Sequence, residues 1–246
     1  MKPDITMQEV PFLSNEQMIE VDRAMMEDFH IDLIQMMENA GRSLAQLARW
    51  RFLGDNPAGK RVIALAGGGG NGGGALVAAR HLHNWGTDVI VILGQDVRRM
   101  APVPGHQLDI LSRLQVDIQP SWDAAAVENT DLVLDGLIGY GLRGTPKGKI
   151  AELIRRANGL ITPTLALDTP SGVDTASGAV SDPAIRAVAT MTLALPKVGL
   201  RLPSALAHVG ELYVADIGVP PELYGRPPLL LSVGPIFAAA DTLRLW

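Results

Sequence analysis

Three segments of the chain combine glycines with side chains that could do chemistry. In residues 67–74, seven glycines surround Asn71, which is the only other residue there. A second segment begins at Asp135 and continues into a further glycine-rich stretch, and a third carries Asp168 and Ser171. Bare backbone N–H groups suit phosphate, and carboxylates can act as acids, bases or ligands. The three segments therefore predict a ligand site if the fold brings them together.

Strands alternate with helices around these segments. Apolar residues at helical spacing predict two N-terminal helices, and Ser14 or Asn15 can cap the first of them. The alternation predicts a Rossmann-like α/β fold, a three-layer sandwich with a mostly parallel central sheet and helices on both faces. Helices are expected over residues 13–29, 32–53, 75–86, 105–115 and 148–159, and strands over residues 61–67, 88–94, 130–139, 163–172, 189–196 and 210–218.

Parallel strands end at the same edge of a sheet, and α/β proteins bind their ligands beyond that edge. Residues 67–74 follow the first expected strand, residues 135–145 the third, and residues 168–172 the fourth. The glycines and carboxylates of all three segments are therefore predicted to converge. This convergence is the strongest indication of a site that the residues themselves provide.

The glycine run alone leaves two interpretations open. Gly67, Gly69 and Gly72 match a dinucleotide-binding fingerprint between a strand and a helix, but a run of glycines satisfies that spacing easily. A dehydrogenase usually has an acid at the end of the second strand, whereas Asp96 here is displaced from that point. The run is either a cradle for phosphates or a tight turn without a ligand.

The composition narrows the class of protein. The chain has 246 residues, of which 47% are hydrophobic and 19% charged, enough for one large domain with a buried core. Its apolar stretches are too short and interrupted to predict a membrane span, and a net charge of −5 would not attract nucleic acid. There is no cysteine and no apolar core of a signal peptide at the start. We therefore expect a cytoplasmic protein.

Six motifs, in order and spacing, resemble the YjeF N-terminal domain family, the NAD(P)H-hydrate epimerases. The resemblance covers about residues 14–221 of an expected single domain of residues 1–246. The apolar tail, residues 222–246, is expected to pack on the body or on another chain; a remnant of a fused domain is the alternative. The motifs are MENAGRSLA (37–45), the glycine run with ALVAARHL, DLVLDGLIGYGLRG (131–144), LALDTPSGVD (165–174), ATMTLALPKVGL (189–200) and GELYVADIGVP (210–220).

The resemblance implies that the protein interconverts the R and S epimers of hydrated NADH and NADPH, so that a separate dehydratase can restore the cofactor. It also implies one potassium ion (K+) bound by Asn71, Asp135 and Ser171, and a homodimer formed through the N-terminal helices. Asp168 is placed at the substrate, where we expect it to be the catalytic proton donor or acceptor. The substrate-binding positions carried over are Gly70, Asn71, Gly72, Gly73, Gly74, Gly139, Tyr140, Gly141, Leu142, Arg143, Gly144, Thr145 and Asp168.

The glycine run departs from the family's usual pattern of Asn-Asn-x-Gly-Asp-Gly. Gly70 and Gly74 stand where the family has Asn and Asp, and Ala75 replaces the last glycine. Two hypotheses follow. In the first, the chain is an enzyme, which is an epimerase or a close variant acting on a nucleotide-like ligand. In the second, it is a catalytically inactive member that serves as a dimeric scaffold or ligand-binding module. The retained oxygen-bearing side chains favour the enzyme.

Several further residues have a structural as well as a functional interpretation. Asp168 and Asp135 could simply bind backbone N–H groups at a turn and a strand end. Lys197 could contact a phosphate, balance nearby carboxylates or be a surface charge. His81 and His83 are two apart on a helix and therefore face different ways, which argues against a metal pair. The methionines of the first two helices are expected in the core or a dimer contact; they are Met18, Met25, Met26, Met36 and Met37.

Overall fold

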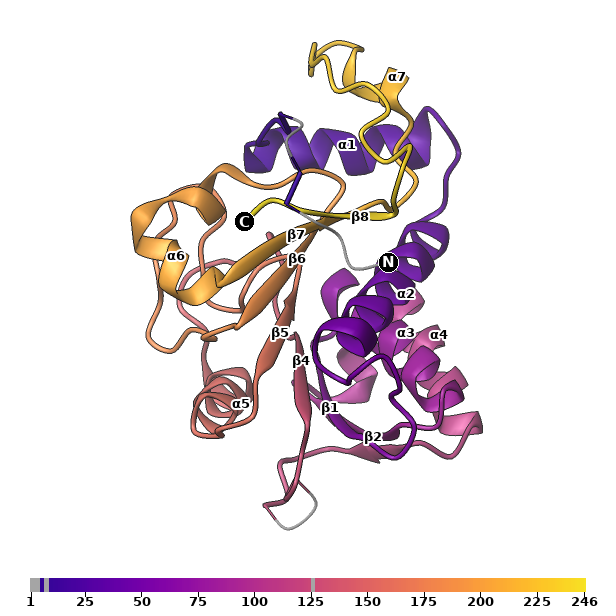
Figure 1. The fold of residues 1–246 in the computed structure, drawn as a ribbon, viewed down its shortest axis with the longest axis vertical. Coiled ribbons are helices and arrows are strands. Elements are labelled where there is room, and N and C mark those ends of the chain that lie inside the picture. Colours follow the sequence, from indigo (N-terminus) through magenta and orange to yellow (C-terminus); the bar gives the residue numbers. More distant parts are fainter. Residues whose placement is uncertain (1–4, 7–8, 125–126) are drawn as a thin grey trace.

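The computed structural model describes residues 5–6, 9–124 and 127–246, which form an α/β sandwich around one eight-stranded sheet (Figure 1). The last strand is antiparallel to its neighbour and the other pairings are parallel. The predicted fold class is confirmed. Across the sheet the strands are β3 (Asp117–Gln119), β2 (Asp88–Leu93), β1 (Arg61–Ala66), β4 (Leu132–Gly136), β5 (Thr164–Leu167), β6 (Ala189–Leu193), β7 (Glu211–Ala215) and β8 (Thr242–Arg244).

Helices cover both faces of this sheet, and its inner strands are apolar on both sides because both sides are buried. One face carries α2 (Leu33–Arg51), α3 (Gly70–Asn84) and α4 (Pro102–Arg113), and the other carries α5 (Gly148–Asn158) and α6 (Pro203–Val209) (Figure 1). Two further helices, α1 (Asn15–Glu27) and α7 (Pro221–Tyr224), lie together at one end of the sheet. Two short 3-10 helices, η1 (Val97–Arg99) and η2 (Val198–Arg201), follow β2 and β6.

The first helix begins where its sequence predicts. The Ser14 hydroxyl accepts a hydrogen bond from the backbone N–H of Gln17 over 3.2 Å, and the Gln17 side chain accepts one from the Ser14 N–H over 2.9 Å. This reciprocal capping box satisfies two N–H groups that have no partner inside the helix. It fixes the start of α1, and with it the orientation of the helix face that meets the rest of the protein.

The predicted start of the third helix was wrong, because α3 begins within the glycine run, at Gly70, and not at residue 75. Three of its glycines pack so closely that a side chain would collide. A Cβ atom on Gly72 would lie 1.9 Å from the Gly67 carbonyl oxygen, one on Gly73 would lie 2.4 Å from Sδ of Met37, and one on Gly74 would lie 2.7 Å from Cδ2 of Leu167. The glycines therefore let α3 approach β1, α2 and β5, and none of them needs a left-handed backbone.

Two short edge strands, β3 and β8, were not expected from the sequence. The three residues of β3 include Asp117 and Gln119, so no apolar run marks them. Strand β8 belongs to the apolar tail. The tail packs on the body of the protein, which was one of the two arrangements expected from the sequence. Leu229 and Ile236 are buried there, and the indole N–H of Trp246 donates to the Gly210 carbonyl over 2.9 Å. The tail thus covers the edge of β7 that would otherwise be open.

The strand order reverses between β1 and β4, which are neighbours although two strands lie between them in the sequence. Such a switch point leaves a crevice beyond the carboxyl ends of the strands, because the connections on its two sides run to opposite faces. The glycine run follows β1 here, and residues 137–145 follow β4.

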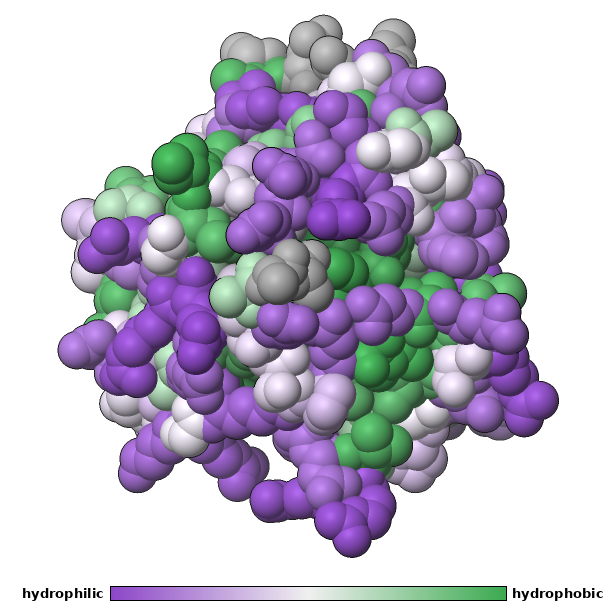
Figure 2. Space-filling model, turned by 90° about the horizontal axis from the view of Figure 1, so that it is seen from below, coloured by the Kyte–Doolittle hydropathy of each residue, from purple (hydrophilic) through white to green (hydrophobic). Residues whose placement is uncertain are grey.

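At the other end of the sheet the surface is mainly hydrophilic, with hydrophobic residues between the hydrophilic ones (Figure 2). Within the described residues no helix is both long and apolar enough to cross a membrane.

Candidate functional site

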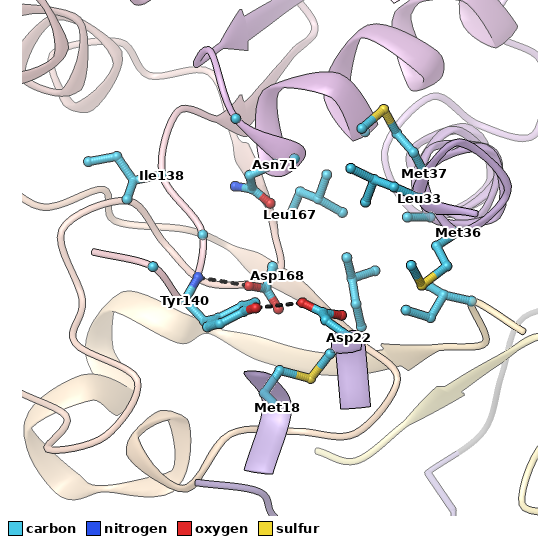
Figure 3. A pocket seen from close by; sticks show the side chains of 18 of the residues that line it. Met18, Asp22, Leu33, Met36, Met37, Asn71, Ile138, Tyr140, Leu167 and Asp168 are labelled. Atoms are coloured by element: carbon cyan, nitrogen blue, oxygen red, sulfur yellow. Dashed lines mark hydrogen bonds between the residues drawn. The ribbon is translucent and has the colours of Figure 1, made fainter. Parts of the chain in front are cut away.

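A cavity of about 630 Å³ lies at this switch point, between the carboxyl ends of β1, β4 and β5 and the two N-terminal helices. One wall is apolar and comes mainly from α1 and α2, with Met18, Met36 and Met37 in it (Figure 3). Of the five methionines that we expected in the core or a dimer contact, Met18, Met26, Met36 and Met37 line the cavity, whereas Met25 is buried outside its lining. The facing surface is polar, and its side chains are Asp22, Asn71, Tyr140, Arg143, Asp168 and Lys197.

Asp168 occupies the centre of the polar surface, directly after β5. Its Oδ1 accepts a hydrogen bond from Nζ of Lys197 over 2.6 Å, and its Oδ2 accepts one from the backbone N–H of Tyr140 over 2.9 Å. Its backbone is left-handed, with φ of 63°, a conformation that Asp and Asn adopt more readily than most residues. The turn thus aims a carboxylate into the cavity and fixes both of its oxygens.

Lys197 is fully buried, so it is not a surface charge. Besides Asp168, its ammonium group contacts the Leu193 carbonyl oxygen over 3.0 Å and Oγ1 of Thr192 over 3.4 Å. Of the three interpretations open at the sequence, the structure supports the one in which Lys197 balances a carboxylate. A buried charge without such a partner would be strongly destabilising.

Asp22 is a member of the site that the sequence argument missed. Its Oδ2 accepts a hydrogen bond from the Tyr140 phenol over 2.5 Å (Figure 3). Burial raises the pKa of Asp22, while the phenol and the Lys197 charge act in the opposite direction. Burial also raises the pKa of the Tyr140 phenol, as does the neighbouring Asp22 charge. Helical spacing was the available signal, because residue 22 lies four after Met18 and three before Met25 on the buried face of α1.

Asp135 and Ser171 lie behind the cavity surface and bind each other. The Ser171 hydroxyl donates to Oδ1 of Asp135 over 2.6 Å, and the Ser171 N–H donates to Oδ2 over 2.8 Å. The Ser171 hydroxyl also accepts from the Ile138 N–H over 2.8 Å. Burial raises the pKa of Asp135 to about 6, although the hydrogen bonds from Ser171 and Leu137 lower it. The pair joins the loops that follow β4 and β5.

Asn71 projects from the first turn of α3 towards Asp168 (Figure 3). Both its amide nitrogen and its amide oxygen are buried and have no hydrogen-bond partner among the described residues. A buried amide normally finds partners, so an unpartnered one facing a cavity points to a ligand. Gly139 closes the gap beside it, since a Cβ atom there would lie 3.3 Å from Cγ of Asn71 and 3.0 Å from Oδ2 of Asp168.

The substrate-binding positions expected from the sequence fall into three groups. Seven line the cavity: Gly70, Asn71, Gly74, Gly139, Tyr140, Gly141 and Arg143, in addition to Asp168. Leu142, Gly144 and Thr145 lie around an adjoining hollow of about 350 Å³, which also meets Arg143 and Lys147. Gly72 and Gly73 are buried in the packing of α3 and do not line either space. His81 contacts Glu38 over 2.8 Å, away from the cavity lining.

The fold and the site together define an α/β protein with a cavity at a switch point of its parallel sheet, whose lining is mainly apolar and carries a cluster of polar side chains. The chain belongs to the family described as YjeF-related protein N-terminus, whose model matches residues 33–199. This confirms the resemblance seen in the six motifs.

Known relatives place it within that family. An NAD(P)H-hydrate epimerase of Dehalogenimonas lykanthroporepellens is 44% identical over 232 residues, which are 93% of this chain and 90% of that protein. One of Rhodopirellula baltica is 34% identical, covering 91% and 89%. A bifunctional NAD(P)H-hydrate repair enzyme, Nnr, of Salinibacter ruber is 34% identical, and the match spans 42% of its length. The crystal structure of the yeast protein ynu0 shares the fold, with a TM-score of 0.81, 23% identity, and coverage of 96% and 100%.

Proposed function

We propose that this protein is an NAD(P)H-hydrate epimerase, which interconverts the R and S epimers of hydrated NADH and NADPH. Relatives that match nearly their whole length carry that name. The observation that carries the proposal is the pairing, in one cavity, of a fixed carboxylate on Asp168 with the unpartnered amide of Asn71. The apolar wall of methionines suits a ring, and the polar surface suits its substituents.

Epimerisation needs a proton donor and acceptor beside the carbon that carries the hydroxyl group. That carbon is bonded to the ring nitrogen, so inversion requires either that the hydroxyl leaves and returns or that the ring opens and closes. Asp168 is suited to take and return the proton, because each of its oxygens keeps a lone pair beyond the bonds to Lys197 and Tyr140. The Lys197 ammonium group holds Oδ1 of this carboxylate in place over 2.6 Å.

A potassium ion is part of the proposal, with Asn71, Asp135 and Ser171 as its side-chain ligands. The donor set fits, because all three offer oxygen, the ligand atom that hard cations prefer, and the Asn71 amide oxygen lacks a partner. The buried Asp135 carboxylate would gain a counter-charge. When bound, the ion would supply positive charge for substrate oxygens. We expect the midpoint of thermal unfolding to rise more in KCl than in NaCl at equal ionic strength, and Asn71→Ala to remove that difference.

The loop of residues 139–145 and the start of α3 are proposed to bind the remainder of the substrate. Arg143 borders both the cavity and the adjoining hollow, so a phosphate group there could reach its guanidinium. We also propose a homodimer, supported by the exposed apolar residues of α1 and α2, among which Ile19 is 57% and Ile34 37% accessible. Ile34→Glu should lower the sedimenting mass if the dimer forms there. A cytoplasmic location remains an expectation from the sequence.

The deciding experiment supplies the purified protein with the R epimer of hydrated NADPH and follows the S epimer, with and without potassium. Asp168→Asn should reduce the rate by about 10²- to 10⁴-fold. Asn tolerates the left-handed backbone of residue 168, so the variant should fold. Asp174→Asn changes a turn carboxylate that lies outside the cavity lining and should match the wild type. A wild-type rate equal to the spontaneous one would support the inactive, ligand-binding alternative.

A further inference from the structure

Tyr140 is held at both of its ends by carboxylates that come from different parts of the fold. Its backbone N–H donates to Asp168, which follows β5, and its phenol donates to Asp22, which belongs to α1 (Figure 3). Hydrogen bonds to ionised acceptors are shorter and stronger than neutral ones. The side chain of Tyr140 therefore bridges the cavity from the central carboxylate to the N-terminal helix.

The contacts form a closed ring, because α1 is also tied to the segment of Lys197. The Leu13 N–H donates to the Pro196 carbonyl over 2.8 Å, and the Val198 N–H donates to the Leu13 carbonyl over 2.9 Å. Leu13 directly precedes the cap of α1, and Asp22 lies about two turns further along the helix. Lys197 in turn binds Asp168. Movement of α1 would therefore disturb Asp168 through both its lysine and its tyrosine contact.

The environment of Asp22 argues that its carboxylate is kept for a purpose other than stability. It lies on the buried face of a helix whose neighbouring positions are Met18, Val21 and Met25. Burial disfavours its charged form and raises its pKa. In other proteins, apolar residues at such positions are often at least as stabilising as buried charges. The carboxylate supplies what an apolar residue cannot, a strong acceptor that fixes the orientation of the Tyr140 phenol.

We propose that Asp22 is a positioning residue for Asp168, and that it acts through Tyr140 to hold residues 139–145 over the cavity. The effect of Asp22 on turnover rests on the proposed function, whereas its contact with Tyr140 does not. With the phenol fixed, the Tyr140 N–H stays on Oδ2 of Asp168, and Gly139 stays against Asn71 and Asp168. Small displacements of a proton-transferring group reduce rates steeply, so this restraint acts on turnover more than on substrate binding.

Variants of the two partners test the contact. Tyr140→Phe and Asp22→Ala should each lower kcat about tenfold with less than threefold change in KM, and the double variant should be no slower than the worse single variant. Asp22→Asn keeps an acceptor oxygen and should lose less than Asp22→Ala. The matched control is Tyr224→Phe, which removes a buried hydroxyl that has no hydrogen-bond partner among the described residues. It should keep the wild-type kcat.

Hydrogen exchange of the Tyr140 amide gives a readout that does not depend on epimerase activity. Exchange should accelerate about tenfold in Tyr140→Phe and Asp22→Ala and stay unchanged in Tyr224→Phe. If the two variants exchange faster but the wild-type protein has no epimerase activity, the proposed function is overturned and the contact between Tyr140 and Asp22 is supported. Wild-type exchange in Tyr140→Phe, or faster exchange with an undiminished kcat, would overturn the positioning role of Asp22.

Discussion

Nζ of Lys197 lies 2.6 Å from Oδ1 of Asp168, and the two side chains are 0% and 5% exposed. This ion pair joins the turn after β5 to the segment between β6 and η2, and it forms the floor of the polar surface. A pair buried to this extent contributes little net stability, because desolvation offsets the attraction of its charges. Removing only one partner should lower the stability strongly, since it leaves a buried charge without compensation.

Lys197→Met should therefore destabilise the protein by about 3–5 kcal/mol, as measured by urea denaturation. Lys60→Met is the matched control, because Lys60 pairs with Asp131 over 3.1 Å but remains 45% exposed. A pair of that kind contributes at most about 1 kcal/mol. Adding Asp168→Asn to Lys197→Met should restore part of the lost stability by removing the uncompensated charge. Equal losses in the two lysine variants would contradict a dominant role for burial.

The glycines of the run should respond very differently to alanine. Gly72→Ala would place its methyl group 1.9 Å from the Gly67 carbonyl, and since backbone cannot rotate away, we expect a loss of about 3 kcal/mol or more. A Cβ atom on Gly70 would meet nothing within 4 Å, so Gly70→Ala should be neutral or stabilise the protein by up to about 1 kcal/mol. Thermal unfolding of both variants measures the contrast. A tolerated Gly72→Ala would mean that α3 can shift away from β1.

The sequence was sufficient for the fold because its buried strands are short apolar runs and its helices show helical periodicity, with a capping box at the start of the first one. It also predicted that Asn71 and Asp168 would meet, since both follow parallel strands. Helical spacing indicates that Asp22 lies on the buried face of its helix. It does not indicate that this face meets the cavity, because the helix precedes the sheet and reaches the cavity only through tertiary packing. The start of α3 was misplaced for a similar reason. Glycine has a poor helix propensity, but close contacts with Gly67, Met37 and Leu167 outweigh that preference here.

Gly74 stands where the resemblance described above leads us to expect Asp, and the structure shows that Leu167 occupies the space. Because a Cβ atom there would lie 2.7 Å from Cδ2 of Leu167, Gly74→Asp alone should cost about 1–3 kcal/mol. Combined with Leu167→Val it should cost less than the sum of the two single changes by at least about 0.5 kcal/mol. Urea denaturation of the four proteins in this cycle gives the coupling energy. Gly70→Asp has free space around its Cβ and serves as the control. Strict additivity would show that Leu167 is not what excludes the acid.

The burial of Asp22 should leave a signature in the pH dependence of stability. Its pKa is raised in the folded protein, so the folded state holds the proton more tightly than the unfolded chain does, and stability falls as pH rises above about 4. Tyr140 and Lys197 oppose this effect, whereas Asp168 adds to it, and Tyr224 is the other titratable group close by. Asn cannot titrate, and Asp22→Asn should therefore gain stability relative to the wild type between pH 4 and pH 7.

Asp28, the C-cap of the same helix, provides the control with the opposite sign. The hydrogen bond from Arg23 lowers the pKa of Asp28, so its contribution is present at neutral pH and is lost as pH falls. As pH rises from about 2 to about 5, Asp28→Asn should become less stable relative to the wild type, whereas Asp22→Asn should become more stable as pH rises above about 4. Guanidinium denaturation at several pH values compares the two slopes. Parallel slopes would show that Asp22 is solvated in the folded protein and that its contact with Tyr140 does not persist in solution.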